Sequence, residues 1–366
     1  MIFKWGKNMK NGTPKYVQLA EWIKLKIRQD GLEKGDKFYT EHALAERFSV
    51  SRQTVRQAIN VLINEGVLES RQGSGTYIAS PMRSHRNASK TIGVIVTYFD
   101  EYIFPSIING IESVISEKGY TMLVACTRND NEKEAAALRN MIDSNVDGLI
   151  VEPTKSALPN GNIDIYREIA EKEIPLIFAN SFYPDIKFPY VSLDDVKAGY
   201  LAAACLMEHG HSKIALMLKS DDMQGHLRYQ GAMEAAYNQG IQISKENTLW
   251  FTTEDIKYLE EDSGRIMRYI GDSTAVLCYN DQTAATLLKV LEKNNRKVPE
   301  DISVISIDDA SQATTCNPKL TTVAHPKKLM GNVIAQSLFR VIEGENYEAT
   351  YKFTPEIVLR DSVKRV

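Results

Sequence analysis

Apolar side chains recur at helical spacing in three successive stretches near the start of the chain. The first stretch begins after Pro14 and ends at Gly31, with apolar residues every three or four positions. A shorter second helix is predicted over residues 40–48 and a third over residues 51–65. Ser51 is a favourable N-cap for the third helix, and Gly66 is a typical stop signal.

The third helix and the segment after it indicate a winged helix-turn-helix. One side of this helix is an apolar stripe formed by Val55, Ile59, Leu62 and Ile63. The opposite side is polar and basic, with Arg52, Gln53, Arg56 and Gln57. Two helices joined by a tight turn can lay the N-terminus of the second one in a DNA major groove. Residues 67–80 then read as two short strands around a glycine-rich tip, which is the pattern of a wing.

From Ile92 onward, apolar strands alternate with amphipathic helices. The predicted strands cover residues 91–98, 120–126, 147–152, 174–180, 213–219, 274–280 and 302–307. Continuous apolar strands separated by helices predict parallel sheets covered on both faces. Because this region is long for one doubly wound sheet, and because a second run of strands begins near Lys213, we expect two such sheets in two lobes.

These patterns divide the chain into two domains. We expect an α+β winged helix-turn-helix domain at residues 14–80 and a polar linker at residues 81–91. An α/β two-lobed domain should then cover residues 92–366. Its N-lobe is predicted at about 92–209 plus 325–345, and its C-lobe at about 210–322 plus 350–366.

Composition and charge support this division. The chain has 366 residues, of which 43% are hydrophobic and 25% are charged, which is typical of a folded multidomain protein. Residues 1–90 hold 16 Lys and Arg against 8 Asp and Glu, whereas residues 91–366 hold 28 against 39. A basic head on an acidic body is expected when only the head meets a polyanion. The sequence shows neither a signal-peptide pattern nor a membrane-spanning apolar stretch, so we expect a cytoplasmic protein without membrane contact.

Polar side chains gather where the predicted strands end. In both lobes these ends should face a common cleft, because ligands of open α/β sheets bind at the carboxyl ends of the strands. The residues concerned are Tyr98, Glu152, Asn180, Lys219, Gln224, Arg228, Asn280 and Asp308. Carboxylates, amides and an arginine together suit a polyhydroxylated ligand, since each hydroxyl both donates and accepts. Helix N-capping is the alternative role for such residues, and for Asp195 and Asp281 both roles stay open.

The head resembles the GntR-type winged-helix family. The resemblance runs from Lys15 to Ala79 and is strongest in LAERFSVSRQTVRQAINVLINEGVLESRQGSGTYI. It implies that Arg52, Gln53, Thr54 and Arg56 contact DNA from the third helix and that His42 does so from the second. It also implies that Gln72 and Gly73 form the wing tip and that Lys15 meets a phosphate. These side chains suit the task, since Arg can fork onto guanine and Lys acts as a point charge for phosphate.

The body resembles the effector domain of the LacI/GalR family, which is similar to periplasmic sugar-binding proteins and has no catalytic activity. The resemblance lies in GHSKIALM, RYQGAMEAA, LCYNDQTAATLLKVL, KVPEDISVISIDD and PKLTTVAHP. It implies that Arg228 clamps a sugar and that Asn280 and Asp308 bind hydroxyls. It further implies a polar contribution from His325 on a crossover segment and places Asp194 close to the cleft. The family's own small helix-turn-helix and hinge helix are absent here, and the GntR-type head replaces them.

The combination of this head with TYFDEYIFPSIINGIE and GLIVEPTKSALPN resembles a family of bacterial repressors that respond to arabinose. The resemblance implies a homodimeric transcriptional repressor of sugar-utilisation genes that leaves double-stranded operator DNA when L-arabinose binds. Open alternatives are another sugar, an activator, and a sugar-binding transport component. We expect no enzyme activity, cofactor or metal, because no nucleophile, phosphate-loop or metal motif is found. His209 and His211, which form an HxH pattern, are better explained by helix capping and packing.

Overall fold

The computed structural model describes residues 14–32, 34–71, 74–79, 89–345 and 348–366. The chain divides between residues 85 and 86 into two compact units, each described here by itself. Most of the predicted linker lies outside the described residues. Its last residue, Thr91, is already the first residue of a strand. Within the described ranges, no helix has the length and apolar character needed to span a bilayer.

The first unit is the predicted winged helix-turn-helix. It contains α1 (Lys15–Gln29), α2 (Glu41–Phe48) and α3 (Arg52–Asn64), followed by the antiparallel strands β1 (Leu68–Arg71) and β2 (Gly75–Ile78). Side chains from all five elements form its core, in which Leu19, Leu44, Leu62 and Ile78 are fully buried. The first unit therefore has its own hydrophobic core, as an independent domain requires.

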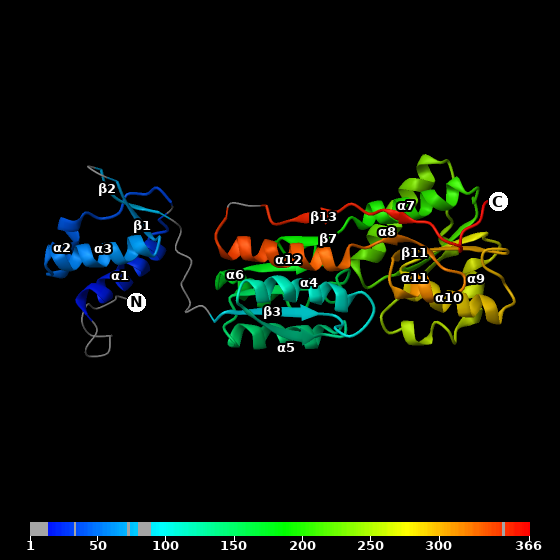
Figure 1. Ribbon diagram of the computed structural model, residues 1–366, viewed down its shortest axis with the longest axis horizontal. Coiled ribbons are helices and arrows are strands. Elements are labelled where there is room, and N and C mark those ends of the chain that lie inside the picture. The colour runs from blue at the N-terminus through cyan, green and yellow to red at the C-terminus, as the bar shows by residue number, and fades with distance from the viewer. Residues whose placement is uncertain (1–13, 33, 72–73, 80–88, 346–347) are drawn as a thin grey trace. The chain divides into compact units, whose positions relative to one another are not determined.

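The second unit contains two sheets with the same strand order. The first has the order β13-β7-β6-β5-β3-β4 and is parallel throughout. Its strands are β3 (Thr91–Val96), β4 (Thr121–Cys126), β5 (Gly148–Val151), β6 (Leu176–Ala179), β7 (Tyr190–Leu193) and β13 (Tyr351–Phe353). The helices of this lobe are α4 (Phe104–Glu117), α5 (Asn131–Asp143), α6 (Ile163–Glu171) and α12 (Lys327–Ile342). Figure 1 shows α12 running alongside α4.

The second sheet has the order β14-β12-β11-β10-β8-β9 and is parallel except at the β12–β14 edge. Its strands are β8 (Ile214–Lys219), β9 (Thr248–Phe251), β10 (Ala275–Cys278), β11 (Ser303–Asp308), β12 (Thr321–Ala324) and β14 (Ile357–Val358). Its helices are α7 (Asp195–Glu208), α8 (Met223–Asn238), α9 (Ser263–Ile270), α10 (Asp281–Lys293) and α11 (Ser311–Thr315), with 3-10 turns at Lys245–Asn247 and Ile256–Tyr258. Two mainly parallel sheets confirm the predicted fold class.

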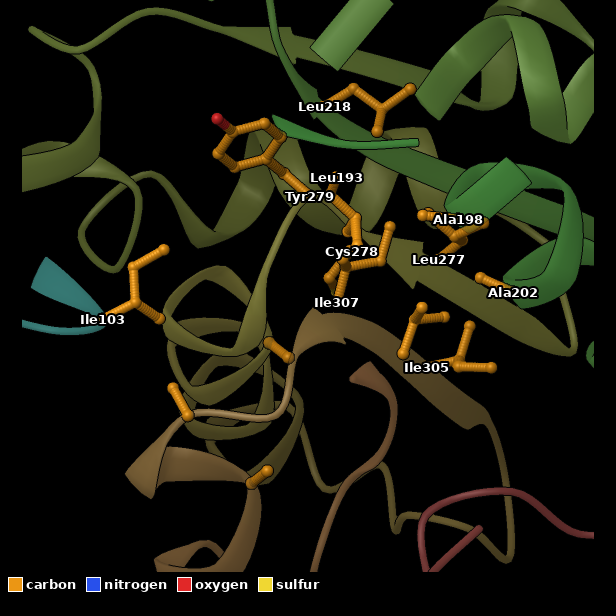
Figure 2. Packing of buried hydrophobic residues seen from close by; sticks show 14 of the residues in the cluster. Ile103, Leu193, Ala198, Ala202, Leu218, Leu277, Cys278, Tyr279, Ile305 and Ile307 are labelled. Atoms are coloured by element: carbon orange, nitrogen blue, oxygen red, sulfur yellow. The ribbon is translucent and has the colours of Figure 1, made fainter. Parts of the chain in front are cut away.

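Two predicted lobe boundaries are wrong. Helix α7, expected in the N-lobe, packs against α8 and the second sheet, and Figure 2 shows its Ala198 and Ala202 beside Leu277 and Ile305. Strand β13, expected in the C-lobe, pairs with β7 in the first sheet. The chain therefore crosses between the lobes after β7, after β12 and after β13. Tertiary packing decides where the chain crosses between lobes, so the apolar periodicity of the strands cannot predict it.

In each lobe, glycines let two helices cross closely. A Cβ atom added at Gly331 of α12 would lie 2.1 Å from the Ile107 carbonyl oxygen of α4, and one at Gly231 of α8 would lie 1.8 Å from the Val196 carbonyl oxygen of α7. Both neighbours are backbone atoms, which cannot rotate away. The two helices of each pair can therefore lie this close only because the residue at the crossing is glycine.

We expect Gly331→Ala to destabilise the second unit by about 1–3 kcal/mol or more, because the two helices must separate to admit the methyl group. The measurement is thermal unfolding followed by circular dichroism. Gly264→Ala is the matched control, since Gly264 is an exposed residue of α9 and no neighbouring residue of the described structure comes within 4 Å of the added Cβ. An equal loss of stability in both variants would contradict the steric explanation.

Candidate DNA-binding surface and effector cavity

The N-terminus of α3 presents the predicted recognition residues. The side chain of Ser51 accepts a hydrogen bond from the backbone N–H of Thr54 and caps the helix, as the sequence predicts. Arg52, Gln53 and Arg56 are exposed, whereas Thr54 is half-buried and its hydroxyl lies 2.9 Å from that of Ser51. A helix N-terminus carries partial positive charge, so this surface combines cationic side chains with a favourable dipole for a polyanion.

The predicted DNA contacts differ in how free their side chains are to meet DNA. Lys15 and His42 are exposed, and His42 lies 3.5 Å from Glu46 on the same helix. The Nε of Arg56 donates to Glu41 of α2 at 2.9 Å, so this arginine is already engaged in an ion pair. Gln72 and Gly73, the predicted wing tip, lie outside the described residues.

The base of the wing carries two cations that sequence reasoning missed. Lys37 forms an isolated bridge with Tyr77, and its ammonium lies 5.9 Å from the centre of the Tyr77 ring. The guanidinium of Arg71 lies 4.4 Å from the same ring and also pairs with Glu69. Arg71 could have been noticed beside the glycine-rich tip. Lys37 could not, because only the fold brings it next to Tyr77.

In the second unit, a cavity of about 260 Å³ lies between the two lobes. The two sheets share the strand order that places a topological switch point beside β3 and β5 in one lobe and beside β8 and β10 in the other. Eight of the ten predicted ligand residues line the cavity, from strand ends of both sheets and from α8, namely Tyr98, Glu152, Asn180, Lys219, Gln224, Arg228, Asn280 and Asp308. Strand polarity thus brings side chains that are far apart in sequence to one site.

Arg228 is the fixed cation of the cavity. It is 4% exposed, and its Nε donates to Asp195 at 2.9 Å while Nη2 donates to Asp308 at 3.3 Å. A further N–H donates to the Tyr279 carbonyl, so three of its five donors bond protein oxygens and two have no acceptor among the described residues. Burial opposes the charge of Arg228, but Asp195 and Asp308 together raise its pKa. Burial also raises the pKa of Asp195 to about 6 despite the neighbouring guanidinium.

Lys219 is the second buried cation and is also paired. Its ammonium donates to Asp222 and lies 3.7 Å from Asp221. Burial opposes its charge, whereas Asp222 and Asp221 raise its pKa above the ordinary value. Each buried cation of the cavity therefore has two carboxylate neighbours, which leaves little positive charge to attract an anionic ligand.

The wall formed by the first lobe offers acceptors. Oε2 of Glu152 accepts from the Thr97 backbone N–H at 2.9 Å and the Thr97 hydroxyl at 2.6 Å, and Oε1 accepts from Asn180 at 3.0 Å. Burial raises the pKa of Glu152 to about 7, although these donors oppose the shift. Tyr98 packs against Phe104 nearby, and Phe251 packs against Tyr279 on the opposite wall. The cavity thus combines polar groups with apolar ring surface.

Hydrogen bonds join the lobes around the cavity. The Tyr102 hydroxyl, from the first lobe, donates to Asp308 at 2.7 Å and accepts from the backbone N–H of Asp281 at 3.2 Å. Asn129 donates across the gap to Thr253 at 2.6 Å, and Lys155 pairs with Glu254 at 2.5 Å. These contacts join the two lobes directly beside the cavity.

Several residues lining the cavity have left-handed backbone angles. The φ values are 61° at Tyr102, 56° at Asn129, 62° at Asn180 and 109° at Asp308. Residues other than glycine rarely adopt such angles, and each instance costs about 1–3 kcal/mol. Eight other non-glycine residues of the described structure also have positive φ and do not line the cavity, so such angles are not confined to this site.

Two predicted ligand residues do not line the cavity. Asp194 caps α7 by accepting from the Lys197 N–H at 3.1 Å, and the next residue, Asp195, is the one that reaches Arg228. His325 is buried beside the cavity and bonds Asn180 in place of a ligand. The open question for Asp281 is also answered, because its carboxylate binds Ser306, Thr322 and the Ala310 N–H rather than facing the cavity.

Sequence reasoning missed several cavity residues, chiefly Tyr102, Asp222 and Tyr279. Asp222 stands beside the predicted Lys219 in KSDDMQG, so its position after a strand was an available signal. Tyr102 had none, because its role depends on a loop of one lobe reaching the other. The two histidines of the HxH pattern have the predicted capping and packing roles. His209 is the C-cap of α7, and His211 is buried and bonds Thr274.

Comparisons with known proteins agree with the division into two kinds of domain. The family described as bacterial regulatory proteins, gntR family, matches residues 15–78, and the periplasmic binding protein-like domain matches residues 203–363. An arabinose metabolism transcriptional repressor of Geobacillus stearothermophilus is 38% identical over 364 residues, which cover 98% of this chain and 100% of the relative. One from Halalkalibacterium halodurans is 37% identical, covering 95% and 96%. The crystal structure of the transcription regulator CcpA of Lactococcus lactis matches 75% of this chain and 99% of its own, with a TM-score of 0.67 and 26% identity.

Proposed function

Because the chain belongs to the family of arabinose metabolism transcriptional repressors, we propose that its cavity binds L-arabinose and that the bound sugar releases α3 from operator DNA. The protein is thus a regulator of sugar-utilisation genes, and we propose no catalytic role for it. Since its target is chromosomal DNA, we place it in the bacterial cytoplasm.

The charge arrangement of the cavity is the observation that carries the effector assignment. The two buried cations, Arg228 and Lys219, are both paired with carboxylates, and Lys257 at the cavity is exposed to solvent, so a phosphorylated or acidic sugar would find little unbalanced positive charge inside the cavity. A neutral polyol instead finds the remaining N–H donors of Arg228 and the acceptor oxygen of Glu152. The volume of about 260 Å³ lies just below the range of about 300–1,000 Å³ that is typical of ligand pockets, which favours a ligand as small as a monosaccharide.

The mechanism follows from the position of the cavity between the lobes. A sugar that touches both walls binds the closed arrangement more tightly than any open one, so it shifts the population toward closure. Release from DNA requires that closure and operator binding oppose each other by a coupling free energy, typically about 1–3 kcal/mol. By reciprocity, operator DNA must weaken sugar binding by the same factor.

A homodimer is part of this proposal. One winged helix reads a short half-site, and two heads on one dimer match a roughly palindromic operator. Lobe movement can then act on DNA binding by changing how the two heads are presented. Sedimentation should accordingly show a species of twice the 41.2 kDa chain mass.

We expect L-arabinose to release the purified protein from fluorescent duplexes that carry the promoter region beside its own gene. Binding is titrated by anisotropy at one fixed salt concentration, because phosphate contacts make affinity steeply dependent on ionic strength. D-Glucose and D-xylose serve as matched neutral sugars and should not release it. Tight DNA binding that ignores arabinose would remove the sugar assignment, and absence of specific DNA binding would contradict the regulatory function itself.

A further inference from the structure

His325 connects a lobe crossover to the wall of the cavity. It follows β12, at the point where the chain passes toward α12, and it is 4% exposed. Its Nε2 lies 2.9 Å from Oδ1 of Asn180, and Nδ2 of Asn180 donates to Oε1 of Glu152 at 3.0 Å. A chain of two hydrogen bonds therefore runs from the crossover to a carboxylate that faces the cavity.

The surroundings of the imidazole decide which groups donate and which accept in these two hydrogen bonds. Burial lowers the pKa of His325 to about 4, so the ring is neutral at physiological pH and carries one N–H. Nδ1 is buried and has no hydrogen-bond partner among the described residues. If the proton sits on Nε2, it bonds Asn180 and only a lone pair is left unpaired. If it sits on Nδ1, a buried N–H is left without an acceptor, which is the rarer and costlier case.

The tautomer of His325 in turn fixes the amide of Asn180. With a proton on Nε2, the oxygen of Asn180 accepts from His325 and its NH₂ group points to Glu152. The reversed amide would set its oxygen against Oε1 of Glu152, which requires a protonated carboxyl there. The favoured tautomer therefore favours an ionised Glu152 that accepts hydrogen bonds.

The protonation state of Glu152 is sensitive to the loss of a hydrogen bond, because the effects that raise its pKa and those that lower it together place the pKa close to neutral pH. Burial raises its pKa to about 7, against three donated hydrogen bonds from Thr97 and Asn180, and Asp222 raises it further. The other charged or titratable side chains lining the cavity are Tyr98, Glu101, Tyr102, Lys219, Asp222, Arg228, Lys257, Tyr279 and Asp308. The charges acting on His325 are those of Asp308, Lys327 and Arg228. Near such a balance, loss of one donor changes the protonation state at neutral pH.

We propose that His325 is a positioning residue which, through Asn180, keeps Glu152 as a hydrogen-bond acceptor, so that the cavity selects an effector with a hydroxyl donor at this wall. This inference rests on the proposed function only in that the effector occupies the cavity. His325 does not touch the effector and sets the polarity of the group that does.

The direct test measures the protonation of Glu152 without any sugar. The full-length protein is labelled with glutamate carrying ¹³C at the side-chain carboxyl, and the Glu152 signal is assigned with Glu152→Gln and followed over pH. His325→Gln keeps an amide donor near the position of Nε2 and should retain the wild-type midpoint. His325→Asn places its amide near Nδ1, out of reach of Asn180, and should raise the midpoint by about 1 pH unit or more.

Thermal unfolding followed by circular dichroism reports whether the second unit, which contains His325, is folded in both variants, so their comparison isolates one donor position. Equal midpoints in wild type, His325→Gln and His325→Asn would overturn the proposal. In an Asn180→Ala background, His325→Asn should cause no further change of the midpoint. A change of the same size there would show that His325 does not act through Asn180.

The second readout is the pH dependence of L-arabinose affinity. A sugar hydroxyl donates to ionised Glu152, so protonation competes with binding and affinity falls about tenfold per pH unit below the midpoint and is level above it. His325→Asn should move this profile to higher pH, and His325→Gln should not. A wild-type protein that binds no arabinose at any pH would count against the proposed effector, while the carboxyl titration would still decide the role of His325.

Discussion

An Arg228→Met protein is expected to bind its operator normally and to stay bound when L-arabinose is added. The guanidinium of Arg228 keeps two N–H donors for a ligand after bonding Asp195, Asp308 and the Tyr279 carbonyl. Hydrogen bonds to a charged group contribute about 1.5–3 kcal/mol each, so losing both should weaken sugar binding roughly 100-fold or more. Isothermal titration with L-arabinose measures the loss, and operator release follows it.

This substitution also affects stability. Removing Arg228 leaves Asp195 and Asp308 buried without their shared cation, and breaking a buried ion pair typically costs about 3–5 kcal/mol. Arg228→Lys is the matched variant, because it keeps a positive charge between the two carboxylates but lacks the planar fork. It should fold more stably than the Met variant and still bind arabinose far more weakly than wild type. Release of either folded variant at the wild-type arabinose concentration would contradict the assigned role of Arg228.

The cavity was largely predictable from sequence because strand polarity is predictable. Glu152, Asn180 and Asp308 each end an apolar strand, and parallel strands present their carboxyl ends at one edge of a sheet. Once two doubly wound sheets were expected, these residues had to approach one another across the gap between the lobes. Their convergence follows from chain direction alone.

The path of the chain between the lobes was not predictable in the same way. Helix α7 crosses to the second lobe and β13 returns to the first, and both depend on packing surfaces that only the folded chain creates. The error over Asp194 has the same origin. Which of two neighbouring aspartates reaches Arg228 depends on how α7 crosses α8, where Gly199 lets the helices approach closely.

Sequence analysis also could not predict which side chains contact the cavity through another residue or from the opposite lobe. His325 was expected to touch the ligand, whereas the structure places Asn180 between it and the cavity wall. Tyr102 was not expected at all, because its hydroxyl reaches Asp308 from the other lobe. A single side chain that bridges two lobes leaves no periodic pattern, so its role can be found only when distances are known.

In the winged-helix unit, Arg52→Ala is expected to abolish specific operator binding while L-arabinose affinity is retained. Arg52 is exposed at the first position of α3 and has no ion-pair partner among the described residues, whereas Arg56 is held by Glu41. A bidentate hydrogen-bonded pair of arginine and guanine contributes about 1–3 kcal/mol of discrimination, and a dimer would lose it at both heads. Anisotropy with operator and scrambled duplexes measures the loss.

The salt dependence of the remaining binding distinguishes the two ways in which Arg52 could act. If Arg52 reads a base, its removal abolishes the preference for operator over scrambled DNA and leaves the salt slope nearly unchanged. If it holds a phosphate, affinity falls for both duplexes and the slope decreases by about 1 for each phosphate that the variant no longer neutralises. Arg167→Ala, at an exposed arginine of α6 in the other unit, should change neither quantity. An Arg52→Ala protein that binds operator like wild type would contradict the placement of α3 in the major groove.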